Sequence, residues 1–459
     1  MTSKKTRPSN LPVALGQEIE LSFEDLLSNG QAVGRLRGMA IFVFGPLPDE
    51  RARVRVTTVK QKYAVAELLE ILETAETRAE PFCPVFGTCG GCQVQHLKYE
   101  AELHWKRSVV ENALRRIGGI ADVQVSATIG IAVPREYRNK MSLIVDHRND
   151  STGFGFYKQR SHDVVPIDHC PIVQPALNRL IGALIDVRRD STTAPAFQAA
   201  RHVVSRTSLR SRQNIVAITT PEPDAAVASL SQTLKERLPS TAGIVESFGL
   251  HNDNAILGRR VRVVAGRDSI EEVVGSLRFK ISPRSFFQVN IEILERIFEA
   301  LKSLATGTRE IIDLYCGSGA FALFFASLGC TVFGVEENAI AVDEARENAL
   351  ANSLAERVQF RRGRVEDVVT EPAIRKRLQS AGAVFLDPPR RGTDARVLTA
   401  IAEARVASVW YLSCDPATLA RDLKLLLPKG YRLSGVQPFD MFPQTGHIES
   451  LAVVSRVEK

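Results

Sequence analysis

The sequence predicts a mixed α/β protein, in which a small N-terminal β-barrel and a strand-rich middle region precede a C-terminal parallel sheet. Residues 12–72 carry short segments of alternating apolar residues separated by Gly and Pro, as expected for a compact barrel. Residues 123–275 also look strand-rich, whereas strands and helices alternate from about residue 278 onwards, as they do in βαβ units. We therefore expect three domains, at 12–72, 73–277 and 278–459.

Local signals define the elements within this plan. The expected barrel strands are 17–21, 40–44, 51–60 and 63–71. A helix is expected from about Tyr99 to Ile117, where Gly118-Gly119 closes it. Met141–Asp146 and Gly153–Lys158 are expected to form a hairpin. In the C-terminal region we expect a helix at 321–328 and strands at 310–314, 331–335, 384–386 and 409–412.

The composition describes a globular chain with an excess of positive charge. The net charge of +7 and the pI near 9.1 favour a polyanionic partner, and two blocks, Arg51–Arg55 and Arg361–Arg364, concentrate that charge. No apolar run approaches the roughly 18 residues needed to span a bilayer, and the basic N-terminus lacks the apolar stretch of a secretory signal. We expect a cytoplasmic monomer that does not bind membranes, with residues 1–10 as a disordered tail.

A strand-to-helix loop in the C-terminal region has the features of a nucleoside-binding turn. Within Asp313–Phe321, Gly317 and Gly319 allow a tight turn and a close approach of the backbone to a ligand. Glu336 ends the next strand about 20 residues further on, where a carboxylate can bind ribose hydroxyls. The third glycine of the dinucleotide fingerprint is absent. This disfavours NAD and fits S-adenosylmethionine, which has no pyrophosphate, and Cys316 is interpreted as a small loop residue.

Two further strand ends carry residues suited to catalysis. Asp387 follows a buried strand and should lie at the carboxyl edge of the sheet, where open α/β folds bind ligands. Amino-directed methyltransferases carry an aromatic residue where this chain has Arg390, which argues against methylation of an exocyclic amine. Cys414 follows the strand at 409–412. A thiolate is suited to adding to C6 of a uracil, and this addition makes C5 nucleophilic.

The same chemistry requires a base that removes the proton from C5. Glu449, in a glycine-containing loop before the final strand at 451–454, is the candidate. His447 is the competing candidate, and it could equally be a structural hydrogen-bonding residue.

Together these segments resemble the RNA uracil-5 methyltransferase family over nearly the whole chain. The resemblance implies a class I, Rossmann-like methyltransferase domain preceded by a TRAM domain, an OB-like barrel that binds RNA. It implies Cys414 as the nucleophile and Glu449 as the catalytic base. The cofactor-binding residues that it implies are Gln288, Tyr315, Gly317, Gly319, Glu336 and Asp387.

The chain departs from the family pattern at three places. Asp415 stands where the nucleophile motif usually has asparagine, and its negative charge would tend to raise the pKa of the neighbouring thiol. Ala320 stands where an asparagine often contacts the cofactor, and Gln444 stands where histidine is frequent. None of these differences removes a catalytic group.

Four cysteines form a separate pattern. Cys83, Cys89 and Cys92 cluster around a Gly-Gly pair, and Cys170 follows. Four thiolates can hold zinc or an iron–sulfur cluster, and the spacing leaves both open. The odd total of seven cysteines argues against a closed disulfide framework. Resemblance to the rRNA-modifying branch of the family implies a [4Fe–4S] cluster that ties the middle domain together and shapes the RNA surface.

The resulting expectation is an enzyme that uses S-adenosylmethionine to methylate carbon 5 of a uridine in 23S rRNA. The thymine-loop uridine of tRNA is the alternative substrate. The bacterial tRNA enzyme lacks both the front barrel and the cysteine cluster, although some archaeal tRNA relatives carry a cluster. A second alternative is a non-catalytic iron–sulfur RNA-binding protein, which would have a damaged cofactor loop or no nucleophile.

Overall fold

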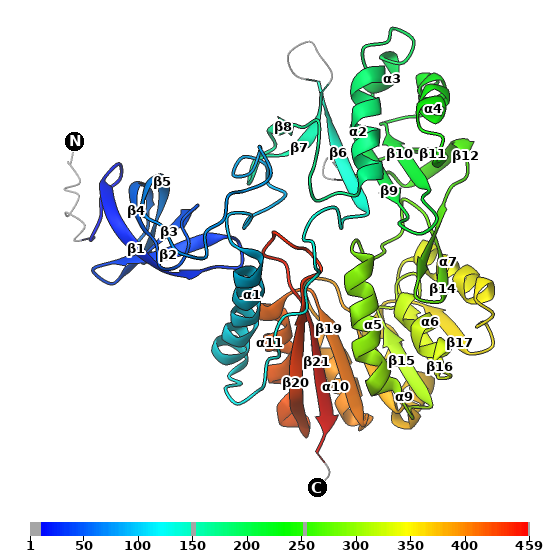
Figure 1. The fold of residues 1–459 in the computed structure, drawn as a ribbon. Helices are drawn as coiled ribbons and strands as arrows, with labels where there is room; N and C mark the ends of the chain where they lie inside the picture. Colours follow the sequence, from blue (N-terminus) through cyan, green and yellow to red (C-terminus); the bar gives the residue numbers. More distant parts are fainter. Residues whose placement is uncertain (1–10, 148–152, 251–254, 458–459) are drawn as a thin grey trace, which may run out of the picture. The chain divides into compact units, whose positions relative to one another are not determined.

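The computed structural model describes residues 11–147, 153–250 and 255–457, and Figure 1 shows their helices and strands. The N-terminal tail expected at residues 1–10 lies outside the described residues. Contacts divide the chain into two compact units. The first comprises the residues up to Gly87, Cys92–Val109 and Gln444–Gly446, and the second comprises Thr88–Gly91, Val110–Pro443 and the chain from His447 onwards.

The first unit is built around a closed barrel with the strand order β1-β2-β3-β5-β4. Its strands are β1 (Glu18–Leu26), β2 (Gln31–Leu36), β3 (Met39–Phe44), β4 (Arg51–Val59) and β5 (Tyr63–Glu73). Buried apolar side chains at alternate positions, among them Leu21, Phe23 and Val54, fill its interior. The sequence analysis missed β2, because four consecutive residues of this strand are buried and show no alternation.

The outer face of β4 carries the first arginine block. Each arginine forms an ion pair with a glutamate of β1 or β5: Arg51–Glu20 at 2.9 Å, Arg53–Glu70 at 3.3 Å and Arg55–Glu18 at 2.9 Å. Since an anion matches each cation on the same face, the block offers little net positive charge to a polyanion. Cross-strand pairing therefore explains these arginines better than an RNA contact does.

The second unit contains a mixed seven-stranded sheet with the order β12-β11-β10-β9-β6-β7-β8. Its strands are β6 (Lys140–Asp146), β7 (Gly153–Tyr157), β8 (Val164–Pro166), β9 (His202–Thr207), β10 (Asn214–Thr219), β11 (Thr241–Phe248) and β12 (Arg260–Gly266). The predicted hairpin is confirmed, because β6 and β7 pair antiparallel with Ile144 opposite Gly155. Helices α2 (Pro175–Val187) and α4 (Ala226–Arg237) pack on this sheet, and α3 (Pro195–Gln198) packs on α4.

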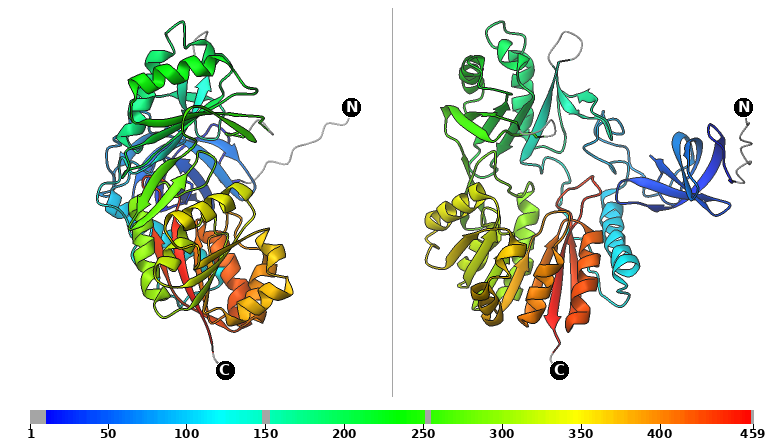
Figure 2. Two further views of the ribbon diagram at one scale, coloured as in Figure 1. Left: turned by 90° about the vertical axis from the view of Figure 1, so that its right-hand side faces the viewer. Right: turned by 180° about the vertical axis from the view of Figure 1, so that it is seen from behind.

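A second seven-stranded sheet has the order β17-β16-β15-β18-β19-β21-β20, and Figure 2 shows helices on both of its faces. Its strands are β15 (Glu310–Leu314), β16 (Thr331–Glu336), β17 (Val358–Arg362), β18 (Ala383–Leu386), β19 (Ser408–Ser413), β20 (Tyr431–Phe439) and β21 (Glu449–Arg456). The hairpin β13 (Ile270–Val274) and β14 (Leu277–Ile281) precedes it.

The helices around this sheet follow the predicted alternation. They are α5 (Ile291–Ala305), α6 (Ala320–Ser327), α7 (Ala339–Ala351), α8 (Val365–Val368), α9 (Pro372–Ser380), α10 (Ala395–Glu403) and α11 (Pro416–Leu426). The earlier helix α1 (Tyr99–Ala113) continues as a π-helical turn to Gly118, close to the end predicted from Gly118-Gly119. Among the described residues, none of the helices combines the length and the apolar character that crossing a bilayer requires.

The strand directions define the functional edge of this sheet. Strands β15 to β19 pair parallel, whereas β21 pairs antiparallel with both β19 and β20. The loops that follow β15, β16, β18 and β19 therefore meet at one edge. One prediction is corrected here. Glu449 is the first residue of β21, paired with Phe439, and does not lie in a loop before a strand that starts at 451.

Candidate active site

A cavity of about 470 Å³ opens at the carboxyl edge of the second sheet. The predicted catalytic and cofactor residues that line it are Gln288, Tyr315, Gly317, Glu336, Asp387, Cys414 and Glu449. Gly319 is not among the lining residues. It begins α6 with a φ of +86°, and a Cβ at this position would lie 3.1 Å from the Cβ of Ala345. Close packing against α7 therefore accounts for this glycine.

The loop after β15 lets the backbone approach a ligand closely. Tyr315 and Gly317 both have positive φ, +71° and +53°, so the chain turns sharply between β15 and α6. Glu336 ties this loop to the neighbouring strand: its Oε2 accepts a hydrogen bond from Gly317 N–H at 3.1 Å, and its Oε1 accepts one from Asn338 N–H at 2.8 Å. A carboxylate held beside a glycine turn is suited to binding ribose hydroxyls.

The segment that carries Gln288 is fixed by side chains from elsewhere in the second unit. The buried Arg206 guanidinium, on β9, donates to the carbonyl oxygen of Phe287 at 3.3 and 3.2 Å. The Asn139 side chain donates from Nδ2 to the carbonyl oxygen of Gln288 itself at 3.2 Å. The Gln288 side chain is thereby held at the cavity, where the residue is 5% exposed. Neither anchor was identified from the sequence, because both act across long sequence separations.

Strand pairing brings Cys414 and Glu449 together. Strands β19 and β21 run antiparallel with Ser413 opposite Ser450, so Cys414 follows β19 at the point where Glu449 begins β21. Both residues line the cavity. Burial, and then the charge of Asp387, raises the pKa of Glu449 well above its usual value.

The same cavity favours the neutral forms of the Cys414 thiol and the Asp387 carboxyl. Burial, followed by the charges of Glu449 and Asp387, raises the pKa of Cys414 to about 12. Burial and then the charge of Glu336 raise the pKa of Asp387 to about 7. A cation bound here would lower all of these pKa values, because it stabilises the charged form of each acid.

Arg390 supplies a positive charge beside the thiol. Its guanidinium lowers the pKa of both Cys414 and Glu449, and so opposes burial and the neighbouring carboxylates, which raise both values. Its Nη2 lies 3.3 Å from Nε2 of His447, so the competing base candidate contacts this guanidinium. From the sequence, Arg390 argued only against amine methylation, although its position after Asp387-Pro-Pro at the sheet edge was a usable signal.

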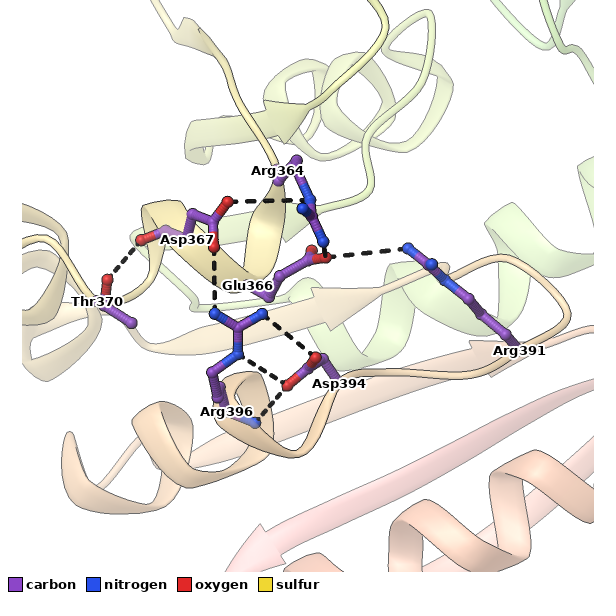
Figure 3. A network of polar contacts seen from close by, with 7 residues as sticks. All are labelled: Arg364, Glu366, Asp367, Thr370, Arg391, Asp394 and Arg396. Carbon is purple, nitrogen blue, oxygen red and sulfur yellow. Dashed lines mark hydrogen bonds and ion pairs between the residues drawn. The ribbon is translucent and has the colours of Figure 1, made fainter.

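A network of ion pairs borders the cavity (Figure 3). Its charged members come from the loop before α8, α8 itself and the segment entering α10: Arg364, Glu366, Asp367, Arg391, Asp394 and Arg396. Glu366 and Arg391 also line the cavity, and their charged groups lie 4.0 Å apart. The sequence analysis missed Glu366, which comes soon after β17 at the same sheet edge. Since Arg364 pairs with Glu366, the second arginine block is also partly neutralised.

The four cysteines of the predicted cluster are divided between the two compact units. Cys83 and Cys92 belong to the first unit, and Cys89 and Cys170 belong to the second. Within the described ranges, no group of three or more His, Cys, Asp or Glu side chains is placed to hold a metal ion. The predicted cluster is therefore not confirmed. A close backbone approach explains why residue 90 is glycine. Its N–H donates to the Tyr157 carbonyl oxygen at 2.9 Å, and a Cβ would lie 3.0 Å from that oxygen.

Comparison with known proteins agrees with this fold and this cavity. A family model described as tRNA (uracil-5-)-methyltransferase matches residues 98–457, and a TRAM domain model matches residues 12–69. The chain belongs to this methyltransferase family. An RNA methyltransferase of Clostridium acetobutylicum is 33% identical over 98% of this chain and 99% of its own length. One of Halalkalibacterium halodurans is 36% identical over 96% and 98%.

A solved structure extends the comparison to three dimensions. The Pyrococcus abyssi tRNA (uracil-54, C5)-methyltransferase, solved in complex with S-adenosyl-L-homocysteine, matches the present chain with a TM-score of 0.75 and 25% identity. The match covers 95% of this chain and all of that one. The protein is thus an RNA methyltransferase of the uracil-5 family, with an N-terminal TRAM barrel.

Proposed function

We propose that this protein methylates carbon 5 of a uridine in RNA through a covalent adduct with Cys414. The observation that carries the proposal is the joint placement of a thiol and a buried carboxylate, Cys414 and Glu449, in one cavity with a glycine turn. A non-catalytic protein would have no need of this arrangement.

The proposed roles follow from the chemistry of uracil. The Cys414 thiolate adds to C6, which places electron density on C5. S-adenosylmethionine, when bound, supplies the methyl group that C5 takes up. Glu449 then removes the C5 proton, and the electron pair of that C–H bond expels the thiolate from C6. Arg390 assists by stabilising the charged forms of both groups.

The cofactor site that we propose lies in the same cavity. Glu336 would bind the ribose, with Tyr315 and Gly317 supplying the close backbone approach. Gln288 and Asp387 would contact the rest of the cofactor. The fit is supported by the positive φ values of the turn and by the carboxylate tied to it. The cavity volume of about 470 Å³ also lies within the range of small-molecule sites.

We propose 23S rRNA as the substrate, on the combination of a TRAM barrel with the cysteine pattern. The competing candidate is tRNA, which is favoured by the similarity to the Pyrococcus abyssi enzyme. Mapping of 5-methyluridine in rRNA and tRNA from a deletion strain, before and after complementation, separates them. Loss from 23S rRNA alone supports the proposal, and loss from tRNA alone overturns it.

The [4Fe–4S] cluster stays a proposal that rests on the sequence pattern alone. Anaerobically purified protein should contain iron and acid-labile sulfide and absorb visible light. Replacement of Cys89 by serine should remove both, with replacement of Cys330 as the matched control. A colourless, zinc-containing protein would contradict the cluster.

Trapping the adduct tests the catalytic proposal. In RNA with 5-fluorouridine at the target position, C5 carries no proton for a base to remove, so the wild-type adduct should survive denaturing electrophoresis. Cys414→Ala should form none, whereas Cys330→Ala, a buried cysteine outside the cavity, should behave as wild type. Glu449→Gln should accumulate the adduct on ordinary RNA. A Cys414→Ala enzyme that makes 5-methyluridine at the wild-type rate would contradict the assignment of Cys414 as the nucleophile.

A further inference from the structure

A second cavity, of about 480 Å³, lies in the part of the second unit built from β6, β7 and β9. It shares no lining residue with the catalytic cavity. We call it the β7 pocket, after the strand that supplies its aromatic wall. The lining residues used below are Ser142, Ile144, Phe156, Tyr157, Lys158 and His202.

Two aromatic residues at the end of β7 line this pocket. Phe156 and Tyr157 both line it, and Tyr157 is 40% exposed. The His162 ring meets the Tyr157 ring edge-on, with centroids 5.5 Å apart and planes at 74°, which restricts its orientation. The backbone of Tyr157 is held by the hydrogen bond from Gly90 N–H to its carbonyl oxygen. The Gly-Gly pair of the cysteine segment thus builds one wall of the β7 pocket.

Two basic residues lie at the rim of the pocket. The turn after β7 is closed by hydrogen bonds from Lys158 N–H to the Asp163 carbonyl oxygen at 2.8 Å and from Ser161 N–H to the Lys158 carbonyl oxygen at 3.1 Å. This turn brings Lys158 and Arg160 to the pocket, and no carboxylate is among the described residues that line it. In a polar pocket beside the catalytic cavity, by contrast, arginines and carboxylates are balanced: Arg364, Arg391 and Arg421 with Glu366, Asp394 and Asp422.

A buried imidazole adds hydrogen-bonding capacity. His202 lines the pocket, is 8% exposed, and its Nδ1 has no hydrogen-bond partner among the described residues. Burial, and then the charge of Arg201, lowers the pKa of His202, so the ring is neutral at physiological pH and one nitrogen can accept a hydrogen bond. A buried polar atom without a partner is costly unless a ligand or water satisfies it.

We propose that the β7 pocket binds one unpaired nucleotide of the substrate RNA, outside the catalytic cavity. The base stacks on Tyr157, and the adjoining phosphate lies against Lys158. Stacking on aromatic rings with basic side chains along the backbone is how proteins hold single strands with little base preference. The inference rests on the proposed function, since it takes RNA as the substrate, and it assigns the pocket to holding the strand that flanks the target uridine.

Binding of a labelled single-stranded RNA of about 12 nucleotides to the full-length protein, followed by fluorescence anisotropy, tests the inference. Tyr157→Ala should weaken binding about tenfold, whereas Tyr157→Phe, which keeps the ring, should change it less than about twofold. Lys158→Ala should weaken binding and flatten the salt dependence. Lys376→Ala removes one exposed positive charge on α9, away from the pocket, and should have little effect.

Two readouts keep the result decisive. Tyr157→Ala should raise the KM for RNA and leave kcat unchanged, and its melting temperature should match the wild type. A duplex of the same sequence should bind Tyr157→Ala and the wild type equally well. Wild-type affinity of Tyr157→Ala for the single strand, or an equal loss on the duplex, overturns the inference. If the protein binds RNA through Tyr157 but transfers no methyl group, the proposed function fails and the pocket stands.

Discussion

The backbone N–H of Thr418 donates a hydrogen bond to Oδ1 of Asp415 at 2.8 Å, so the carboxylate beside the nucleophile caps α11. Pro416 follows at the first helical position, which completes a favourable helix start. Of the influences on the Cys414 thiol, Asp415 ranks behind burial, Glu449, Asp387 and Arg390. The departure from the asparagine of the family motif is therefore accommodated by a capping role that either residue can fill.

Substitutions at Asp415 should separate the cap from the charge. Asp415→Asn keeps an acceptor for Thr418 N–H and should leave the melting temperature nearly unchanged, while the pKa of Cys414 falls slightly and the methylation rate at pH 7 does not decrease. Asp415→Ala removes the cap and should cost about 1 kcal/mol of unfolding free energy. Denaturant unfolding and initial rates check both. Equal stability of the two variants would show that the cap contributes nothing.

Asp387→Asn should reveal the cost of burying this carboxyl. Because the folded-state pKa is raised from 3.8 to about 7, the contribution of Asp387 to stability is present below its unfolded-state pKa and is lost as the pH rises through about 7. The variant should therefore melt a few degrees above wild type at pH 8 and at the same temperature at pH 4. Calorimetry at both pH values measures this. A stability difference that did not vary with pH would contradict the assignment.

Glu336→Gln should weaken cofactor binding selectively. The carboxylate receives backbone N–H groups on both oxygens, whereas a glutamine side chain has only one acceptor oxygen. We expect about a tenfold rise in the KM for S-adenosylmethionine, corresponding to the loss of roughly one hydrogen bond to a charged group. The affinity for RNA should not change. Glu337→Gln, at the neighbouring lining position, is the matched control and should change neither parameter by more than about twofold.

Arg390→Gln should make the Cys414 thiol less reactive. Arg390 lowers the pKa of the Cys414 thiol, which burial and the neighbouring carboxylates still raise to about 12, so its removal should raise that pKa further and slow alkylation of Cys414 several-fold at pH 8. Mass spectrometry of the Cys414 peptide after timed iodoacetamide treatment gives the rate constant. Arg391→Gln, which also lines the cavity, should alkylate at the wild-type rate. Similar rates for all three proteins would remove Arg390 from this role.

In the first unit, the buried pair Lys106–Glu102 should be sensitive to removal of one partner. The two side chains are fully buried and 2.9 Å apart, and Glu102 also accepts a hydrogen bond from Gln444 N–H at 2.7 Å. Lys106→Met removes one cation from a buried carboxylate and should cost about 3–5 kcal/mol. Adding Glu102→Gln should restore most of that loss, because the charge is then absent. Urea unfolding of both variants checks the difference, and no restoration in the double variant would count against a charge effect.

The local patterns that carried the functional prediction are short and continuous. Cys414 and Asp387 each follow an apolar strand, and the Gly317 turn leads to Glu336 one strand later. Parallel strands all end at one edge, so strand ends that are far apart in the chain could be expected to meet. The segment around Gln288 carries no such local signal, and its assignment came from the family resemblance. Glu449 was a candidate base because of its residue type and loop, with His447 as its competitor, and the place of both Gln288 and Glu449 at the cavity depends on long-range contacts.

By itself, the sequence determined the class of fold, the family and the identity of the candidate nucleophile, because apolar periodicity, glycine turns and residue type are properties of neighbouring residues. Only the tertiary structure decided that Glu449 begins β21 beside Cys414, that the β4 arginines are neutralised and that Gly90 packs against Tyr157. The reason is physical: strand register, ion pairing and close backbone approach each join residues that are distant along the chain. Each is determined by packing of the whole fold rather than by local preference.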